Sequence, residues 1–503
     1  MPPVAEALPR APRNGICQWV DQDRPAAAPV PETQIRFVLN GRERTLPHGT
    51  SSTVTLLDWL RGPAGLPGTK EGCAEGDCGA CTVVIEEPGG GRTPVNACLC
   101  LLGQAHGLAI RTVEGLRGAD GGPHPVARAL AEADATQCGF CTPGIAMAAW
   151  AWTREGGDPH EALAGNLCRC TGYRPILEAM GRMALDGAGP SEPVPSVPAT
   201  AACFASEGGV FHLPATLGEA LALRAALPGA WLLAGGTDLG LRVSEGRERP
   251  AAVVALQRVA ELQRLERRDR GIRVGAGVTY ARLMRALQEE PGFAPLLPYL
   301  ARLGSRQIRG IGTVGGNLGT ASPIGDALPP LLALAAEVEL ASATRGIRRM
   351  AVEAFLLGYR RSALAADEII LAVTLPRPPE GALFACEKLS RRHDQDISAV
   401  ALSALLRFGA EGAVAEARLA FGGMGPRAAR ARGAEAALTG RAFDAAAVEG
   451  AAAALAGDFS PLTDWRGGAD WRMAAARGLL RRLHLRHARP DLPPEVHALE
   501  VRA

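Results

Sequence analysis

The 503-residue sequence has few aromatic residues, no excess of charge of one sign and no long apolar run. Phe, Trp and Tyr make up 4% of the chain while alanine is plentiful, which indicates a compositional bias rather than disorder. Lys and Arg number 54 and Asp and Glu 52, for a net charge of +2, so the charge does not indicate a nucleic-acid partner. The longest apolar runs, such as residues 331–336, are far shorter than the roughly 20 residues that span a membrane.

Targeting signals are not evident either. The first residues contain neither a basic start followed by an apolar core nor a twin-arginine pair. Eight of the twelve cysteines have the spacing of metal ligands rather than of a disulfide framework, which favours a reducing compartment. We therefore expect a cytoplasmic protein without a membrane segment, and the length suggests roughly three or four domains.

The first cysteine group has three members within nine residues and a fourth seventeen positions further on. They are Cys73, Cys78, Cys81 and Cys98. This C-x4-C-x2-C…C spacing is the one with which plant-type ferredoxins hold a 2Fe–2S cluster, which moves single electrons. The intervening glycines 72, 76 and 79 allow positive φ and a close approach to the inorganic sulfurs. A zinc site is the alternative, although such sites usually use paired C-x2-C knuckles.

A second group follows as C-x2-C and C-x-C, formed by Cys138, Cys141, Cys168 and Cys170. On its own this pattern also fits zinc or a redox disulfide, but beside the first group it predicts a second 2Fe–2S cluster. The remaining cysteines, at positions 17, 100, 203 and 386, are expected to be inert thiols. Spacing alone cannot choose between Cys98 and Cys100 as the fourth ligand of the first group.

The first half of the chain reads as a small β-grasp domain followed by helices. Residues 34–42 predict a strand ending in an Asn40-Gly41 hairpin, and 82–86 predict a strand that leaves the cysteine loop. Between them, residues 55–61 predict a short helix. From position 125 the pattern is helical, with one helix expected to start at Thr142-Pro143, with Thr142 as its N-cap, and another expected over residues 173–185.

The second half reads as mixed α/β with two glycine-rich stretches. One follows an apolar strand at residues 231–239, and the other spans 309–326. Their backbone N–H groups could form anion-binding nests for a pyrophosphate, and Asp326 could accept hydrogen bonds from a flavin. Plain tight turns are the alternative, since neither stretch is a Walker loop or a G-x-G-x-x-G motif. Downstream of two iron–sulfur motifs, FAD is the expected partner because it converts between one-electron and two-electron carriers.

These motifs together resemble the molybdenum hydroxylase family over about residues 33 to 490. The iron–sulfur part is carried by the stretches 71–82, 96–99, 137–144 and 166–175. The flavin part is carried by 234–239, 313–317 and 321–326, with 358–361 and 388–392 extending the likeness. The resemblance implies an α+β multidomain fold, with an α/β FAD-binding domain of the vanillyl-alcohol-oxidase-like type. Its parts would be a flexible extension (1–32), a β-grasp 2Fe–2S ferredoxin domain (33–116), an all-α 2Fe–2S-binding bundle (117–186), a linker (187–203), the FAD-binding domain (204–380) and a C-terminal α/β flavoprotein domain (381–495).

The resemblance also implies roles for individual residues. It makes Cys98, in the Asn-Ala-Cys-Leu motif, the fourth ligand of the first cluster, and it places Gln137 and Cys170 toward the molybdopterin of a partner chain. Tyr359 and the loop 391–396 would border the nicotinamide side of the flavin. The residues implied to bind FAD are Ala234, Gly235, Gly236, Thr237, Asp238, Leu239, Thr313, Gly316, Asn317, Thr320, Asp326 and Lys388. One departure is Leu303, where relatives can place an aromatic ring against the isoalloxazine.

Within the family the chain is most similar to the small subunit of the bacterial xanthine dehydrogenases. The resemblance then implies two 2Fe–2S clusters and FAD in this chain, a molybdenum cofactor on a large partner subunit, NAD as the acceptor, and a heterotetramer of two small and two large chains. No residue of this chain would act as a catalytic acid or base. The equivalent subunit of an aldehyde or N-heterocycle oxidoreductase is the alternative, because the relay would look the same.

Overall fold

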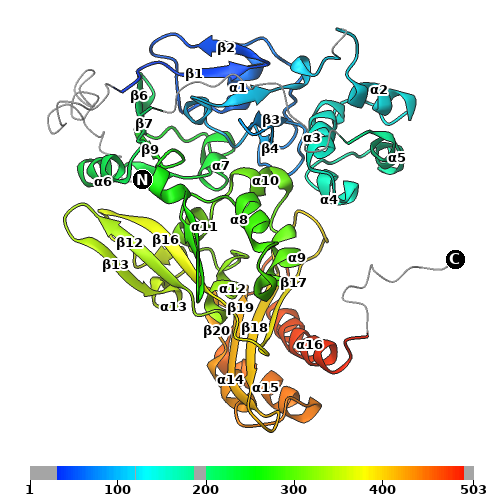
Figure 1. Ribbon diagram of the computed structural model, residues 1–503, viewed down its shortest axis with the longest axis vertical. Helices are drawn as coiled ribbons and strands as arrows, with labels where there is room; N and C mark the ends of the chain where they lie inside the picture. Colours follow the sequence, from blue (N-terminus) through cyan, green and yellow to red (C-terminus); the bar gives the residue numbers. More distant parts are fainter. Residues whose placement is uncertain (1–30, 119–120, 186–199, 492–503) are drawn as a thin grey trace, which may run out of the picture.

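The computed structural model describes residues 31–118, 121–185 and 200–491, and Figure 1 shows their arrangement. Most of the predicted extension (1–32) and of the linker (187–203) lies outside these residues. Two cysteine-bearing domains lie at one end of the molecule and the C-terminal domain lies at the other, with a middle domain between them. None of the helices described is both long and apolar enough to cross a bilayer.

The first domain is a five-stranded sheet in the order β2-β1-β5-β3-β4, with one helix and two short 3-10 turns. Asn40 and Gly41 both have positive φ (53° and 77°), as a two-residue hairpin turn requires, so the predicted hairpin is confirmed. The predicted strand over residues 82–86 and helix near 55–61 are confirmed as well. Its elements are β1 (Arg36–Leu39), β2 (Arg42–Thr45), α1 (Leu56–Arg61), β3 (Thr82–Glu86), β4 (Arg92–Asn96), η1 (Leu102–Ala105), β5 (Ala109–Arg111) and η2 (Val113–Gly115).

The second domain is a bundle of four helices, α2 (Pro125–Glu132), α3 (Thr142–Glu155), α4 (Pro159–Leu163) and α5 (Arg174–Arg182). The prediction of Thr142 as an N-cap is wrong: Cys141 holds that position, and Thr142 is the first helical residue. The hydroxyl of Thr142 lies 2.7 Å from that of Thr136 instead of capping the helix. The last predicted helix, 173–185, is shorter than expected because Tyr173 is in the left-handed region (φ 69°) and the helix ends at Arg182.

The middle domain contains two mixed or antiparallel sheets with helices packed around them. Strand β6 begins at Ala202, so ordered structure starts inside the stretch predicted as linker. The first sheet has the order β6-β7-β9-β8 and the second the order β10-β11-β16-β12-β13. Their strands are β6 (Ala202–Ser206), β7 (Gly209–Leu213), β8 (Trp231–Leu233), β9 (Ala252–Ala255), β10 (Leu265–Arg268), β11 (Gly271–Gly275), β12 (Glu337–Ser342), β13 (Gly346–Ala351) and β16 (Glu368–Pro376), with a β14 (Leu356–Gly358)–β15 (Arg361–Ser362) hairpin beside them.

The helices of this domain connect and cover the two sheets. They are α6 (Leu217–Ala226), α7 (Leu239–Ser244), η3 (Ala260–Gln263), α8 (Tyr280–Leu287), η4 (Pro291–Phe293), α9 (Leu296–Ala301), α10 (Arg306–Ile311), α11 (Val314–Thr320), α12 (Leu328–Ala333) and α13 (Val352–Phe355). The glycine-rich stretch expected as turns therefore folds mostly as the end of α10 and the whole of α11. Thr313 makes this possible because its side chain accepts a hydrogen bond from the Gly316 N–H (3.0 Å) and so caps α11.

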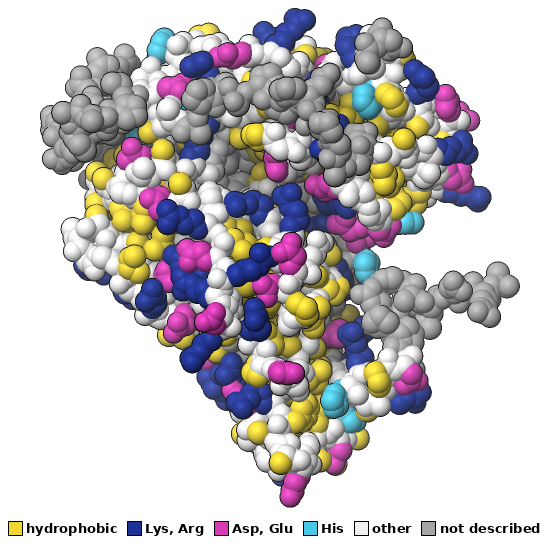
Figure 2. All heavy atoms as spheres, viewed as in Figure 1, with side chains coloured by type: hydrophobic (Ala, Val, Ile, Leu, Met, Phe, Trp, Pro, Cys, Tyr) yellow, Lys and Arg dark blue, Asp and Glu magenta, His cyan; other side chains and the backbone are white. Residues whose placement is uncertain are grey.

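The C-terminal domain is an antiparallel sheet in the order β17-β18-β19-β20 with three helices. Helix α12 of the middle domain contacts β18 and β19, which joins the two domains. Its elements are β17 (Leu383–Leu389), β18 (Val400–Phe408), β19 (Val414–Gly422), β20 (Ala429–Arg430), α14 (Arg432–Leu438), α15 (Ala445–Asp458) and α16 (Ala469–Ala488). On the face seen in Figure 2, basic and acidic side chains are interspersed. Exposed ion pairs such as Arg481–Glu449 (2.6 Å) are an example of such mixed charge at the surface.

The hydrophobic cores cross the domain boundaries. One cluster combines Phe37 and Leu99 of the first domain with Phe211 and Val253 of the β6-β7-β9-β8 sheet. All four side chains are nearly inaccessible to solvent. Ile308 of α10 packs against this cluster and against the core of the second sheet. Because apolar burial is the main stabilising contribution, the ferredoxin-like domain and the middle domain are held as one packed unit.

Candidate cofactor sites

The first cysteine quartet lies in the loop before β3 and in the turn after β4. The Sγ atoms of Cys81 and Cys98 are 3.4 Å apart and buried. The Sγ of Cys73 accepts hydrogen bonds from the N–H groups of Glu75 (3.4 Å) and Cys78 (3.3 Å). Such N–H donors stabilise thiolate charge, as a metal-bound sulfur requires.

Glycines shape this loop in two different ways. Gly76 and Gly79 have positive φ (85° and 65°), as predicted, whereas Gly72 does not. Gly72 is needed for space instead, because a Cβ there would lie 2.8 Å from the Sγ of Cys78. At Gly79 a Cβ would lie 2.0 Å from the carbonyl oxygen of Gly165, which belongs to the second cysteine domain.

Cys98 rather than Cys100 is brought to the other thiols. Its Sγ is the atom close to Cys81, while Cys100 packs in the core that includes Phe211. Burial raises the pKa of the Cys100 thiol to about 12, and it does the same for Cys386. Both therefore remain neutral near pH 7, as expected of inert thiols. Cys203 differs from that expectation because it is disulfide-bonded. Cys17 lies outside the described residues.

The second quartet lies where α3 begins and just before α5. The Sγ atoms of Cys138 and Cys170 are 3.4 Å apart and exposed, and the Sγ of Cys168 lies 3.1 Å from the Oγ1 of Thr171. Gln137, predicted to face a partner's pterin, is exposed beside Cys138. The second quartet therefore reaches the surface, while the Cys81–Cys98 pair of the first is interior.

Each quartet contains one close thiol pair, Cys81–Cys98 in the first and Cys138–Cys170 in the second, and this pairing bears on the expected cofactor. A 2Fe–2S cluster has two irons and four cysteine ligands, so each iron takes two thiolates. A zinc ion would need four donors around one point. Within residues 31–118, 121–185 and 200–491, no three His, Cys, Asp or Glu side chains converge in that way. The donor sets fit 2Fe–2S clusters.

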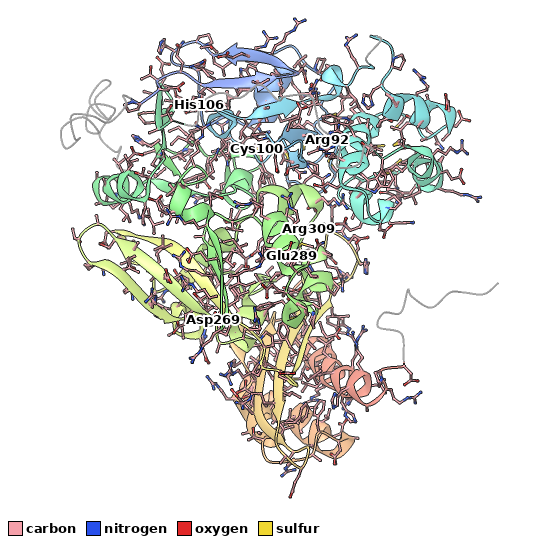
Figure 3. All side chains as sticks on the ribbon, viewed as in Figure 1. Arg92, Cys100, His106, Asp269, Glu289 and Arg309 are labelled. Carbon is pink, nitrogen blue, oxygen red and sulfur yellow. The ribbon has the colours of Figure 1, made fainter. Side chains whose placement is uncertain are left out.

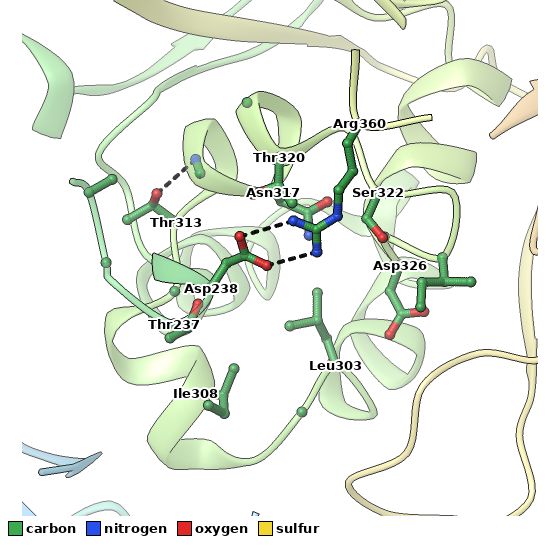
Figure 4. A pocket seen from close by; sticks show the side chains of 18 of the residues that line it. Thr237, Asp238, Leu303, Ile308, Thr313, Asn317, Thr320, Ser322, Asp326 and Arg360 are labelled. Atoms are coloured by element: carbon green, nitrogen blue, oxygen red, sulfur yellow. Dashed lines mark hydrogen bonds and ion pairs between the residues drawn. The ribbon is translucent and has the colours of Figure 1, made fainter. Parts of the chain in front are cut away.

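A cavity of about 1170 Å³ lies between the two glycine-rich stretches. Eleven of the twelve residues predicted to bind FAD line it: Ala234, Gly235, Gly236, Thr237, Asp238, Leu239, Thr313, Gly316, Asn317, Thr320 and Asp326. Figure 4 shows how side chains from both stretches and from the β14–β15 hairpin surround this space. Leu303 and Tyr359 line it as well. The volume exceeds the roughly 300–1,000 Å³ of ordinary small-molecule pockets, so the cavity has room for a large cofactor.

The cavity walls have the features of a dinucleotide cradle. A Cβ at Gly235 would lie 1.9 Å from the carbonyl oxygen of Ile311, and Gly236 has a φ of 85°, so neither position tolerates a side chain. Two polar atoms of the lining, the Oδ1 of Asn317 and the Oη of Tyr280, are buried without a hydrogen-bond partner. Buried polar groups are normally paired, so these two atoms fit contacts with a bound ligand. The residues present therefore fit FAD.

Asp326 is held by two side chains of the C-terminal domain. Lys388 Nζ lies 2.7 Å from Asp326 Oδ2, and Ser398 donates to Oδ1 at 2.5 Å. The side chains of Lys388 and Asp326 are 1% and 8% exposed, so the ion pair is shielded from water. Lys388 does not line the cavity, so its predicted contact with the flavin stays a prediction, and what the contacts support is an action through Asp326.

Sequence reasoning missed two cavity residues that are ordinary in the sequence. Arg360 reaches across the cavity and forms a two-fold ion pair with Asp238, with N···O distances of 3.2 and 3.4 Å (Figure 4). Asp77, which directly precedes Cys78 in the first cysteine loop, lines the same cavity, and burial raises its pKa. In the sequence, only the position of Asp77 beside Cys78 could have indicated that Asp77 lies at a cofactor site.

The first cysteine loop touches both neighbouring sites. On one side Asp77 lines the flavin cavity, and a Cβ at Gly76 would lie 3.4 Å from the side chain of Ile308, another lining residue. On the other side the carbonyl oxygen of Cys78 accepts a hydrogen bond from the Leu167 N–H (2.9 Å). Leu167 precedes Cys168, so the two ligand loops are in direct main-chain contact.

Three protein-family models match the chain. They are the 2Fe-2S binding domain over residues 112–181, the FAD binding domain in molybdopterin dehydrogenase over 204–378, and the CO dehydrogenase flavoprotein C-terminal domain over 385–487. These ranges lie close to the predicted helical, FAD-binding and C-terminal domains. The chain thus contains 2Fe–2S and FAD-binding domains in an α+β multidomain fold.

Individual relatives agree with this result. Xanthine dehydrogenase of Drosophila subobscura is 35% identical over 461 residues, covering 78% of this chain and 34% of the relative. Xanthine dehydrogenase of Emericella nidulans is 32% identical over 526 residues, covering 90% of this chain and 38% of the relative. This chain therefore spans little more than a third of the length of these relatives.

Solved structures give the same family. A CO dehydrogenase from Hydrogenophaga pseudoflava superposes with a TM-score of 0.50 at 30% identity, covering 54% of this chain and 94% of the other. Quinoline 2-oxidoreductase from Pseudomonas putida 86 superposes with a TM-score of 0.51 at 28% identity, covering 56% and 96%. With the two cysteine quartets and the flavin cavity in one chain, these matches show that the protein belongs to the molybdenum hydroxylase family, of which it carries the iron–sulfur and FAD-binding domains.

Proposed function

We propose that this chain is the electron-transfer subunit of a xanthine dehydrogenase of the two-chain bacterial kind. A large partner subunit would hold the molybdenum cofactor and hydroxylate the purine, and NAD would be the final acceptor. The observation that carries the proposal is the position of the loop 73–81, which contacts the second cysteine loop on one side and the flavin cavity on the other. When bound, 2Fe–2S clusters carry single electrons and FAD exchanges between one-electron and two-electron carriers.

The residues of this chain supply position rather than acid–base chemistry. The exposed pair Cys138 and Cys170 lies at the surface, and the pair Cys81 and Cys98 is buried. Leu99, which follows Cys98, has its carbonyl oxygen 3.4 Å from where a Cβ of Gly236, a cavity-lining residue, would lie. This gradient from surface to interior supports the order second quartet, first quartet, FAD. N–H donors to sulfur and the low exposure of the inner pair would tune the potential of the first cluster.

The surface around the second quartet supports a partner at that place. Phe140 and Leu167, which flank the cysteines, are 48% and 46% exposed, an unusual position for large apolar side chains. Gln137 is exposed beside them. A partner that covers this face would bring its cofactor next to Cys138 and Cys170, as a one-electron step requires.

The exposed residues at the flavin cavity support access for a nicotinamide. Tyr359 lines the cavity and is 64% exposed, and Gln395, Asp396 and Ile397 line it from the loop after β17. Hydride transfer needs the two rings face to face. Leu303, a small aliphatic side chain in place of an aromatic ring, leaves space on the flavin side.

The test begins with the isolated chain. Iron and acid-labile sulfide should each be present at about four per chain, as two 2Fe–2S clusters require. The oxidised chain, mixed anaerobically with NADH in a stopped-flow instrument, should lose its flavin absorbance and then reduce ferricyanide. It should not oxidise xanthine until a molybdenum-containing partner is added. A flavin band that stays unchanged with FAD demonstrably bound would refute the dehydrogenase assignment.

The second candidate is the same relay in an aldehyde or N-heterocycle oxidoreductase. It is favoured by the superposition on quinoline 2-oxidoreductase, which covers 96% of that chain. The reconstituted complex should be assayed with xanthine, quinoline, benzaldehyde and CO. Turnover of quinoline or benzaldehyde in preference to xanthine would replace the first proposal with the second.

A further inference from the structure

One side chain of the middle domain reaches both cysteine domains. Gln307 lies on α10 and is fully buried. Its Nε2 donates to the Oγ1 of Thr82 at 3.1 Å and to the Oδ1 of Asn166 at 2.9 Å. Thr82 belongs to the first cysteine domain and Asn166 to the second, 225 and 141 residues away in the sequence.

The three side chains form a closed hydrogen-bonded network on the ligand loops. Asn166 Nδ2 donates to the carbonyl oxygen of Gly79 (2.9 Å) and to Thr82 Oγ1 (3.3 Å). The Thr82 hydroxyl donates to the same Gly79 carbonyl at 2.6 Å. Thr82 directly follows Cys81, Gly79 directly follows Cys78, and Asn166 is two residues before Cys168. Each bond of the network thus ends within two residues of a cluster ligand.

The chemistry of the network requires an amide donor at position 307. The proton of the Thr82 hydroxyl is used on Gly79, so its oxygen can only accept, and the Asn166 Oδ1 is an acceptor by nature. Both partners can therefore only accept, so the side chain at position 307 must supply the N–H donors. The Oε1 of Gln307 is left buried without a partner. An unpaired buried acceptor is unfavourable, so retaining a glutamine here points to a use for its two donors.

Close backbone contact makes the network rigid. A Cβ at Gly165 would lie 1.9 Å from the Oε1 of Gln307, and a Cβ at Gly144 would lie 2.2 Å from the Gly79 carbonyl oxygen. At these two positions of the second cysteine domain, glycine therefore lets the backbone approach the network without a side chain between them. Since packed interiors allow little movement, the position of Gln307 sets the position of both ligand loops.

We propose that Gln307 is a positioning residue for electron transfer: it fixes the separation and relative orientation of the two cluster loops from the flavin-binding domain. This inference rests on the proposed electron-transfer function and deepens it. Gln307 touches no thiol and lies outside the cavity lining, so it acts through Asn166 and Thr82. Misplacing reacting groups by about 1 Å can cost on the order of 100-fold in rate, so loss of the network should slow transfer between the clusters by about tenfold or more.

The same helix provides a matched control. Arg306, the neighbour of Gln307, forms ion pairs with Glu161 (2.5 Å) and Glu155 (3.4 Å) of the second cysteine domain. Arg309 also pairs with Glu161, and Figure 3 labels it in the middle domain. Arg306→Met removes interface contacts of α10 but no bond of the Gln307 network. It therefore separates a general loosening of the interface from the proposed positioning.

The experiment compares Gln307→Met, Gln307→Glu and Arg306→Met in the full chain. Methionine preserves size without donors, and glutamate preserves shape but cannot donate when ionised. Two quantities are measured: the magnetic coupling between the two reduced clusters in low-temperature electron paramagnetic resonance, and the rate at which the second cluster is reduced from NADH. Both Gln307 variants should retain iron and FAD, show weaker or altered coupling, and reduce the second cluster about tenfold more slowly. Arg306→Met should resemble the unaltered protein.

A pair of variants at Thr82 keeps the test decisive if position 307 tolerates no change. Thr82→Val keeps the shape and loses the hydroxyl, so it should reproduce the Gln307 effects, while Thr82→Ser should restore normal coupling. Suppose that Gln307→Met retains its clusters and FAD and that NADH still reduces the flavin. Unchanged coupling and an unchanged rate would then overturn the inference and leave the proposed function intact. Equal slowing in Gln307→Met and Arg306→Met would also overturn it. A chain that NADH does not reduce would instead count against the proposed function.

Discussion

Replacing Lys388 with methionine is expected to destabilise the junction of the middle and C-terminal domains strongly. Lys388 Nζ lies 2.7 Å from Asp326 Oδ2 and also donates to the carbonyl oxygen of Arg302 at 2.7 Å. At that separation two unit charges attract by about 6 kcal/mol at an effective dielectric constant of 20. Desolvation offsets much of this attraction in the native protein. Removing one partner nevertheless leaves the other charge buried, which typically costs about 3–5 kcal/mol.

The assay is calorimetric unfolding of the FAD-loaded chain, because a multidomain protein need not unfold in one step. For a domain of 150–250 residues, each kcal/mol shifts the melting temperature by about 2–4 °C, so Lys388→Met should lower the transition of these domains by roughly 10 °C. The matched control is Lys70→Met, since Lys70 Nζ makes one exposed hydrogen bond, to Pro67. Its transition should be nearly unchanged.

A double variant identifies the cause. Lys388→Met combined with Asp326→Asn removes both charges, so its loss of stability should be smaller than the sum of the two single losses. Additive losses would show that the pair is not coupled. A melting temperature of Lys388→Met equal to that of the unaltered protein would refute the reasoning from burial.

Three further predictions concern the clusters, the partner face and acid sensitivity. Cys98→Ser should abolish the resonance signal of the first cluster while Cys100→Ser preserves both signals; the reverse result would transfer the ligand to Cys100. Gln137→Ala should slow reduction of the clusters by substrate in the reconstituted complex without loss of iron, and an unchanged rate would remove Gln137 from the partner face. Burial lowers the pKa values of His106 (labelled in Figure 3) and His212 to about 4. Unfolded histidine titrates near 6.5, so the unfolded state binds more protons below that pH and stability should fall between about pH 6.5 and 4, by up to ~3 kcal/mol per histidine. His106→Gln should show a smaller loss between pH 7 and 5 in denaturant unfolding, and an equal loss would contradict the assignment.

The features predicted correctly from the sequence are those that depend on neighbours in the chain. The hairpin at Asn40-Gly41 needs two residues with positive φ, and Asn and Gly are the residue types that adopt it most readily, so the sequence predicts the turn. The strand 82–86 and the grouping of cysteines are likewise local. The helix α11 was missed because glycine has a low helix propensity, and here the Thr313 cap and packing against the second sheet outweigh that preference.

The features that the sequence could not predict are contacts between distant segments. Gln307 and Arg360 look like ordinary helix and loop residues, and their partners lie 225 and 122 residues away. Lys388 was predicted to touch the flavin, and that contact stays a prediction; what the sequence did not signal is its ion pair with Asp326, to which β17 presents it from another domain. No motif encodes such a position, because it follows from how the domains dock.

The reciprocal bonds between β17 and Arg302, the residue after α9, have a consequence for how the protein is made. Lys388 donates to the carbonyl of Arg302, and Arg302 donates to the carbonyl of Lys388 at 2.8 Å, so the C-terminal domain completes the wall that carries Asp326. During synthesis the two cysteine quartets emerge from the ribosome long before this wall closes. We therefore expect iron to be inserted before the flavin is captured, and a fragment ending at Pro376 to take up iron without retaining FAD. Retained flavin would then report that the C-terminal domain has docked.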